Sequence, residues 1–72
     1  MNEVIGFLKR NGFERMEKNS YANDKCNVTF EEYGYYGVSD NEGNTMYSTN
    51  LEIYWLIGVL TYYDYIPKNY SK

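Results

Sequence analysis

The chain has 72 residues, enough for one domain whose small core would draw on ten tyrosines, three phenylalanines and one tryptophan. It contains no histidine, the commonest general base and metal ligand, and its single cysteine excludes an internal disulfide. The net charge is −3, and no lysine or arginine occurs between residues 26 and 67, which favours an acidic surface over a nucleic-acid-binding one.

Residues 3–11 form the first predicted helix. Its apolar side consists of Val4, Ile5 and Leu8, extended by Phe7. Asn2 can cap its beginning. Gly12 is well placed as a left-handed residue after the helix, with Phe13 as the hydrophobic contact, so the sequence predicts a Schellman-type end.

Residues 14–22 have no clean apolar face, because charged side chains alternate along them. We interpret this stretch as an edge strand with a kink or bulge near residues 19–20, from which Tyr21 returns to the core. Charged side chains on an edge strand discourage pairing with other chains. Residues 23–25 follow as a turn.

Two strands with alternating apolar residues come next. The first covers residues 26–33 and ends at Gly34, and the second covers residues 35–40. The residues expected to face inward are Cys26, Val28 and Phe30 in the first strand, and Tyr36 and Val38 in the second.

Residues 40–44 predict a hairpin turn in which Gly43 supplies a positive φ. Residues 45–48 then form a short third strand, with Met46 facing inward. The alternative for the turn is a calcium loop, because three oxygen-bearing residues alternate in it. The glycine falls one place too early for such a loop, and its twelfth position, which needs a glutamate, is Leu51. The pattern therefore favours the hairpin turn.

Residues 49–66 are the most apolar segment and form the second predicted helix. Thr49 and Glu52 have the spacing of a capping box, and Asn50 is the alternative cap. The helix should end near Asp64, because a proline follows three residues later. Residues 68–72 would be a polar tail, anchored if at all by Tyr70.

This second helix is apolar almost all round, so it needs cover on more than one side. The sheet, the first helix and a second copy of the protein could each supply it. We expect Tyr54, Trp55 and Tyr62 in the core, and we expect Gly58 to allow a close backbone approach. A membrane span needs ~20 mostly apolar residues, so the segment is too short and too rich in tyrosine to be one.

The predicted fold is one α+β domain over residues 1–72, with residues 69–72 as a frayed end. It has an N-terminal helix, an antiparallel meander of three to four strands and a C-terminal helix, with both helices on one sheet face. The double-stranded RNA-binding fold has the same element order, but its last helix begins with lysines. Here the corresponding residues 49–52 carry no basic side chain, so this function is not expected.

Catalytic, cofactor and metal sites are not expected. Glu31 and Glu32 with Asp40 could be paired carboxylates, but strand neighbours point to opposite faces of a sheet. Cys26 has no histidine partner and heads an apolar strand face, which is typical of a buried hydrophobic residue rather than a nucleophile. We therefore predict that the protein is not an enzyme.

The tyrosines are the most unusual feature, because so small a domain cannot bury all of them. Exposed tyrosine is enriched at protein interfaces, whereas the alternative is that these rings cover the edges of a thin core. The predicted partner-binding residues combine them with the carboxylates: Glu31, Glu32, Tyr33, Tyr35, Asp40, Glu42, Tyr63 and Tyr65.

In size, in its Asn/Tyr/Lys-rich composition and in the run NLEIYWLIGVLTYYDYI, the chain resembles small uncharacterised proteins of bacteriophages and mobile elements. The resemblance implies no binding residue, but it suggests an inhibitor of a host nucleic-acid-binding or defence protein. We expect a cytoplasmic protein, since no signal peptide is evident and the single cysteine fits a reducing compartment.

Our first hypothesis is a non-catalytic interaction module for a basic protein partner, without membrane or nucleic-acid binding. The second is a self-associating structural protein that dimerises through residues 51–63. The third is a single-strand nucleic-acid binder, in which tyrosines would stack on bases. Its basic side would be Lys9, Arg10, Arg15 and Lys18.

Overall fold

The computed structural model describes residues 2–67, which form two helices and a five-stranded antiparallel sheet. The chain is therefore an α+β protein, and its five strands exceed the predicted three to four. Sheet order follows chain order, so each strand pairs with its neighbour in sequence. The elements are α1 (Asn2–Arg10), β1 (Glu14–Glu17), β2 (Ser20–Ala22), β3 (Cys26–Glu31), β4 (Tyr35–Asp40), β5 (Thr45–Tyr47) and α2 (Ile53–Tyr62).

The additional strand comes from residues 14–22, which form a hairpin where we predicted a single kinked strand. The chain reverses at residues 18–19, and the pairing of β1 with β2 shifts register between Arg15 and Glu17. The amide of Phe30 donates to the Asn19 carbonyl (2.8 Å), which holds the turn against β3. Tyr21 is buried, as predicted.

Helix α1 ends as the sequence predicts. Gly12 has a φ of 88°. Its amide donates to the Lys9 carbonyl (3.2 Å), and the amide of Phe13 donates to the Leu8 carbonyl (3.0 Å). These two bonds define a Schellman motif, and Phe13 is buried beside the helix that it terminates. The predicted cap at Asn2 involves a side chain outside the described part of the structure.

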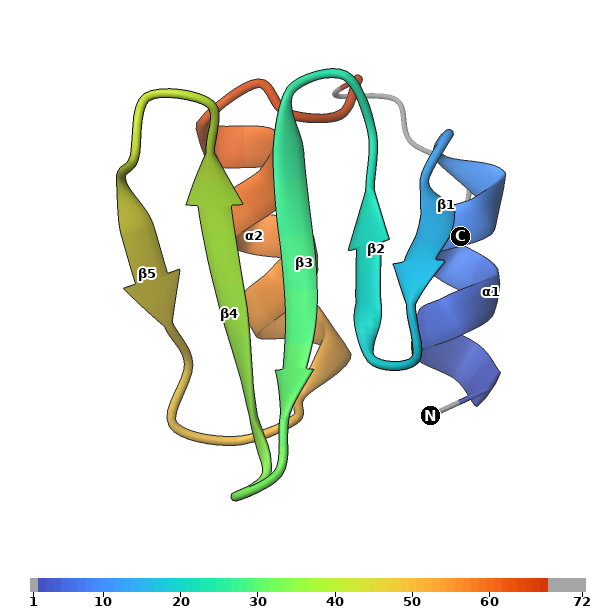
Figure 1. Cartoon of the computed structure of the whole chain (residues 1–72), viewed down its shortest axis with the longest axis vertical. Helices are drawn as coiled ribbons and strands as arrows, with labels where there is room; N and C mark the ends of the chain where they lie inside the picture. Colours follow the sequence, from blue (N-terminus) through green and yellow to red (C-terminus); the bar gives the residue numbers. More distant parts are fainter. Residues whose placement is uncertain (1, 68–72) are drawn as a thin grey trace.

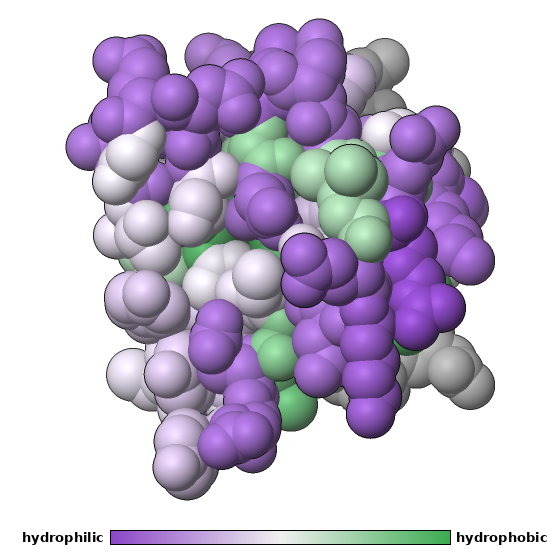
Figure 2. All heavy atoms as spheres, in the orientation of Figure 1, coloured by the Kyte–Doolittle hydropathy of each residue, from purple (hydrophilic) through white to green (hydrophobic). Residues whose placement is uncertain are grey.

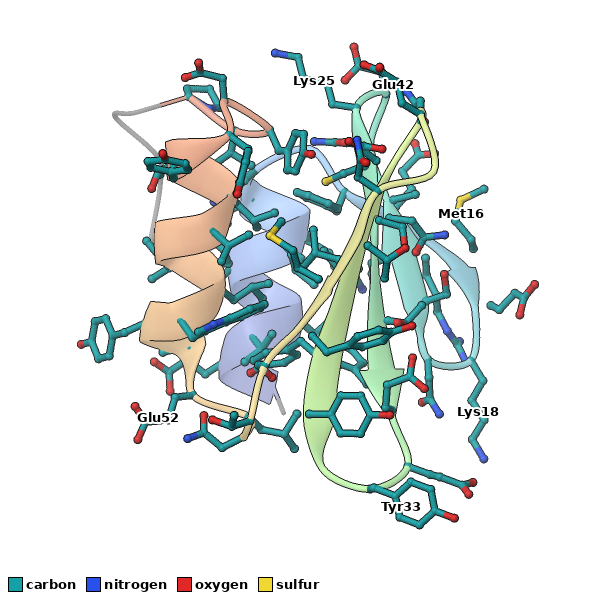
Figure 3. The ribbon with its side chains drawn as sticks, turned by 90° about the vertical axis from the view of Figure 1, so that its left-hand side faces the viewer. Met16, Lys18, Lys25, Tyr33, Glu42 and Glu52 are labelled. Carbon is teal, nitrogen blue, oxygen red and sulfur yellow. The ribbon has the colours of Figure 1, made fainter. Side chains whose placement is uncertain are left out.

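Both helices lie on one side of the sheet. Figure 1 shows α2 behind β3 and β4 and α1 behind the β1 end, and Figure 3 shows both helices to the left of the sheet. The core fills the space between these layers. It consists of Val4, Phe7, Leu8, Phe13, Tyr21, Cys26, Val28, Tyr36, Val38, Leu56, Ile57, Leu60 and Ile66.

The strand alternation is confirmed in the centre of the sheet. Val28 pairs with Val38, and both are buried under the helices together with Tyr36. Phe30 also faces the core and is partly buried. On the opposite face, Figure 2 shows hydrophilic residues across the top and the right-hand side, and residues of intermediate hydropathy over β4 and β5 on the left. One layer of helices is therefore enough to bury the apolar side of the sheet.

Helix α2 begins later than predicted, at Ile53, and the capping box is wrong. Glu52 occupies the N-cap position without a side-chain cap bond. The Asn50 side chain accepts instead from the Glu52 amide (3.0 Å), in the turn before the helix. The Tyr36 hydroxyl donates to the Leu51 carbonyl (2.8 Å) and fixes this connection to β4. The helix ends at Tyr62, and Asp64 follows with a φ of 59°, so the predicted end near Asp64 is confirmed.

The exposed side of α2 corrects our core assignment. Tyr54 is 67% exposed and Tyr62 is 78% exposed, and Trp55 is only partly buried. A Cβ added at Gly58 would meet no atom within 4 Å, so the expected close backbone approach is absent there. The predicted tail at residues 68–72, including Tyr70, lies outside the described residues. Within residues 2–67, the structure has no helix of the length and apolar character that crossing a membrane requires.

Candidate interaction site

The predicted partner-binding residues do not form one surface. They separate into a group at the β3–β4 turn and a group at the turn of residues 40–44. Figure 3 shows Tyr33 and Glu42, one from each group, at opposite ends of the sheet. The six-residue strand β4 separates the two turns by roughly 20 Å, at ~3.3 Å per residue.

At the β3–β4 end the side chains are exposed but make few contacts with one another. Tyr33 is 84% exposed, and Glu32 is exposed next to it. The Glu31 carboxylate accepts from the Thr29 hydroxyl (2.8 Å) on the outer sheet face. Tyr35 contacts Tyr47 edge to face, with 5.7 Å between ring centroids.

At the other end, Asp40 organises the turn. One carboxylate oxygen accepts from the amides of Glu42 and Asn44 (2.9 Å each), and the second accepts from the Asn44 side chain (2.9 Å). The Tyr65 hydroxyl donates to the same second oxygen (3.2 Å). These hydrogen bonds, led by the Asn44 side chain, lower the pKa of Asp40 below its usual value. Gly43, with a φ of 91°, completes the predicted hairpin turn.

Beside this turn lies a polar hollow of about 380 Å³, which we call the acidic pocket. It contains four carboxylates and one ammonium group. The Lys25 ammonium donates to the Asp64 backbone carbonyl (3.1 Å). The segment that follows α2 therefore positions this ammonium group, and no carboxylate takes part in that bond. The lining residues are Asp24, Lys25, Asp40, Asn41, Glu42, Tyr63, Asp64 and Tyr65.

A larger hollow of about 550 Å³ lies between β5 and α2, and we call it the aromatic groove. Among the described residues its lining is uncharged, and the rings of Trp55, Tyr62 and Tyr63 come from α2 and the residue that follows it. Figure 3 looks onto β5, with α2 beside it. Gly58 leaves the middle of the groove open because it has no side chain there. The lining residues are Met46, Tyr47, Trp55, Gly58, Val59, Tyr62 and Tyr63.

Tyr63 lines both hollows and joins them into one surface. Its ring contacts Tyr62 edge to face on the groove side (4.8 Å between centroids) and stacks on Tyr65 on the acidic side (5.8 Å). Burial and the neighbouring Asp40 raise the pKa of Tyr65, so its hydroxyl stays protonated and donates to that carboxylate at neutral pH. The combined surface is therefore apolar at one end and anionic at the other.

Sequence reasoning found the acidic half of this surface but missed the groove. Asp40, Glu42, Tyr63 and Tyr65 were predicted, whereas Trp55 was assigned to the core. A signal was present in the sequence, because Gly58 lies four residues from both Tyr54 and Tyr62. A glycine between two tyrosines on one helical face leaves a bare strip of backbone between large rings.

The structure offers no chemistry at Cys26. The thiol is buried, and burial together with Asp24 and Asp40 raises its pKa to about 12. A thiol that stays protonated at neutral pH is a poor nucleophile and metal ligand. Among residues 2–67, no three histidine, cysteine, aspartate or glutamate side chains are placed to hold a metal ion.

The basic side chains of the nucleic-acid hypothesis lie away from the aromatic groove. Arg15 is in β1 and Lys18 follows that strand, whereas Tyr47 is in β5, and β1 and β5 are the two opposite edges of the sheet. Arg15 also donates to the Glu17 carbonyl (3.2 Å) within its own hairpin. A nucleic acid whose bases stack on Tyr47 and whose phosphates contact Arg15 would thus have to cross the whole sheet.

Comparisons with protein-family models, with curated proteins and with solved structures find no significant match.

Proposed function

We propose that the protein is a small non-catalytic interaction module that binds a protein partner carrying a basic and an apolar side chain close together. The observation that supports this most directly is the continuity of the aromatic groove and the acidic pocket through Tyr63. Rigid aromatic side chains give large contact area at low entropic cost, and carboxylates beside them select for a cation.

The charge of the surface favours a basic partner. Among the described residues, the acidic pocket is lined by Asp24, Asp40, Glu42 and Asp64, and Lys25 is the one cation beside them. Carboxylates arranged in this way can also occupy a site on the partner that otherwise receives phosphate groups. An inhibitor of a nucleic-acid-binding host protein, the role suggested by the phage-like composition, is therefore the biological setting that we propose.

A tagged pulldown from bacterial lysate, washed at low and high salt, tests this proposal with three variants. Tyr62→Ala removes an exposed groove ring, and Glu42→Lys reverses a charge in the acidic pocket. Glu32→Lys makes the same charge change at the opposite end of the sheet and serves as the control. Mass spectrometry identifies the recovered proteins.

We expect one salt-sensitive partner, retained by Glu32→Lys and lost by the other two variants. Truncating an aromatic hot-spot residue costs ~2 kcal/mol or more of binding free energy, enough to remove the partner at either salt concentration. Retention by all three variants would contradict the proposed surface. Recovery of the bait alone, with a dimeric mass in light scattering, would favour self-association instead.

A further inference from the structure

The two edges of the sheet differ in how they are protected. All four residues of β1 are exposed, and three of them are charged. Charged side chains on an edge strand discourage the addition of a further strand. The three residues of β5, Thr45, Met46 and Tyr47, carry no charge. The β5 edge therefore lacks the protection that the β1 edge has.

The register of β5 shows which backbone groups face outward. The Asp40 amide donates to the Asn44 carbonyl (2.9 Å), and the Ser48 amide donates to the Tyr36 carbonyl (2.9 Å). In an antiparallel pair, alternate residues bond to the neighbouring strand and the others point away from it. The amides and carbonyls of Thr45 and Tyr47 therefore point away from β4, toward the free side of the sheet.

The same register shows where a side chain of an added strand would lie. Met46 pairs with Val38, which is buried on the helix side of the sheet, and Met46 itself lines the aromatic groove. Paired residues project to the same face. A residue opposite Met46 would consequently enter the groove, above Gly58 and beside Trp55.

We propose that β5 accepts an extended segment of the partner as a sixth strand, with an apolar side chain in the aromatic groove and a lysine or arginine at the acidic pocket. This inference rests on the proposed function and specifies how the partner binds. The turn of residues 40–44 directly precedes β5, so the acidic pocket lies at the Thr45 end of the edge. Residues two apart on a strand project to one face about 6.7 Å apart, so the cation follows the apolar residue by two to four positions toward that end.

The negative charge of this surface favours a different protein, rather than a second copy of this chain, as the molecule that pairs with β5. Pairing two β5 edges would join two acidic pockets, each with four carboxylates against one ammonium group, that of Lys25, among the described lining residues. Each copy carries a net charge of −3. Like charges facing each other across an interface suppress association. A basic extended segment removes this repulsion and replaces it with attraction.

The test begins with selection from a displayed library of random 12-residue peptides on the immobilised protein. We expect selected peptides to alternate apolar and polar residues, with a lysine or arginine two to four positions from a central apolar residue. Peptides with apolar residues at helical spacing, or without any preference for a basic residue, would overturn the inference. A selection that yields no binder would overturn it as well.

The best selected peptide is then labelled and titrated against Thr45→Pro and Thr45→Val by fluorescence anisotropy. Both substitutions remove the threonine hydroxyl, which pairs with Ser39 (3.1 Å), but only proline removes the outward amide. We expect Thr45→Pro to bind about tenfold more weakly than Thr45→Val, because a main-chain hydrogen bond is lost. Equal affinities would overturn strand addition.

Two controls keep the outcomes distinguishable. If circular dichroism shows that Thr45→Pro does not fold, peptides N-methylated at successive positions replace it, and alternate positions should weaken binding. If Thr45→Pro and Thr45→Val bind equally while Tyr62→Ala loses the peptide, strand addition fails and the interaction module stands. If none of these variants changes binding, the proposed surface fails too.

Discussion

At the scale of single residues, Gly37 explains how the centre of the outer sheet face is packed. A Cβ at this position would lie 2.7 Å from the Thr29 hydroxyl oxygen and 3.2 Å from Cε1 of Tyr47. Gly37 and Tyr47 are paired across β4 and β5, so the tyrosine ring covers the space that a side chain would otherwise occupy. The Thr29 hydroxyl is held in place by its bond to Glu31.

We predict that Gly37→Ala destabilises the protein by about 1–3 kcal/mol, because both neighbours must move to relieve the contact. Urea unfolding followed by circular dichroism measures the change. Gly58→Ala is a suitable comparison, since an added Cβ there meets no atom within 4 Å. An unchanged unfolding midpoint for Gly37→Ala would show that Thr29 and Tyr47 adjust without cost.

The alternation of apolar residues in the sequence predicted which strand residues are buried. It did not predict that position 37 requires a glycine. Val28, Tyr36 and Val38 follow the period of two and are buried as expected. The need for glycine at position 37 depends on a ring that arrives from the next strand. That information exists only once the register of β4 and β5 is known.

At the scale of elements, α2 shows the limit of reading an apolar helix. Leu56, Ile57 and Leu60 are buried, whereas Tyr54 and Tyr62 are exposed. Both faces are apolar in sequence, so hydrophobicity does not indicate which one meets the sheet. The rotation of the helix decides it, and this rotation is fixed by packing against the sheet and by the connection from β5. The aromatic groove could not be located without it.

We predict that Gly58→Ala stabilises the protein by about 0.4–1 kcal/mol, because alanine is the better helix former and the site has room for it. The added methyl group occupies the open middle of the aromatic groove, so affinity for a groove-binding peptide should fall. Urea unfolding and peptide titration measure the two effects on one sample.

The matched control for this variant is Gly6→Ala in α1. Its added Cβ meets only the flexible end of the Arg10 side chain, at 3.0 Å, and lies outside the residues that line the groove. It should raise stability without changing peptide affinity. Equal loss of affinity in both variants would argue that stabilisation itself, rather than the filled groove, weakens binding.

At the scale of the whole molecule, three hydrogen bonds tie the segment after α2 to the sheet. The Asn23 side chain donates to the Tyr65 carbonyl (2.9 Å), and the Lys25 ammonium donates to the Asp64 carbonyl. The Tyr65 hydroxyl donates to Asp40. Ile66 is buried next to these contacts. The acidic pocket is therefore built where the last described residues meet two turns of the sheet.

We predict that Asp40→Asn lowers stability at neutral pH and that this loss disappears in acid. The folded protein lowers the pKa of Asp40, so the carboxylate contributes stability above its unfolded pKa of about 3.9, and this contribution is lost as the pH falls through the folded value. Urea midpoints of wild type and variant should differ by a constant amount above about pH 5, begin to converge below about pH 4, and meet once the pH is below the lowered pKa of Asp40 in the folded protein.

Glu42→Gln is the control for this comparison, because it removes a charge from the same turn without touching the bonds from Asn44 and Tyr65 to Asp40. If the urea midpoints of wild type and Asp40→Asn still differ in strong acid, the loss of stability comes from the altered hydrogen-bonding geometry of the side chain and not from its ionisation.

The order of helices and strands was predictable from the sequence. The grouping of the partner-binding residues into one surface was wrong. Both turns that flank β4 were recognised from Gly34 and Gly43. The length of β4 between them already implied that Glu32 and Glu42 lie far apart, yet acidic and tyrosine-rich residues were grouped by type rather than by position. The fifth strand was missed because residues 14–22 were interpreted as one kinked strand, although the turn at residues 18–19 divides them into β1 and β2.

Because sheet order equals chain order, every strand pairing joins neighbours in sequence and closes only a short loop. The sheet can therefore form by successive hairpins, without a search between distant parts of the chain. The two helices are different, since Phe7 of α1 and Leu60 of α2 belong to one core but lie near opposite ends of the described chain. Bringing Phe7 and Leu60 into one core therefore closes a longer loop than any strand pairing does, so mutations at these two residues should slow folding more than mutations in the turns.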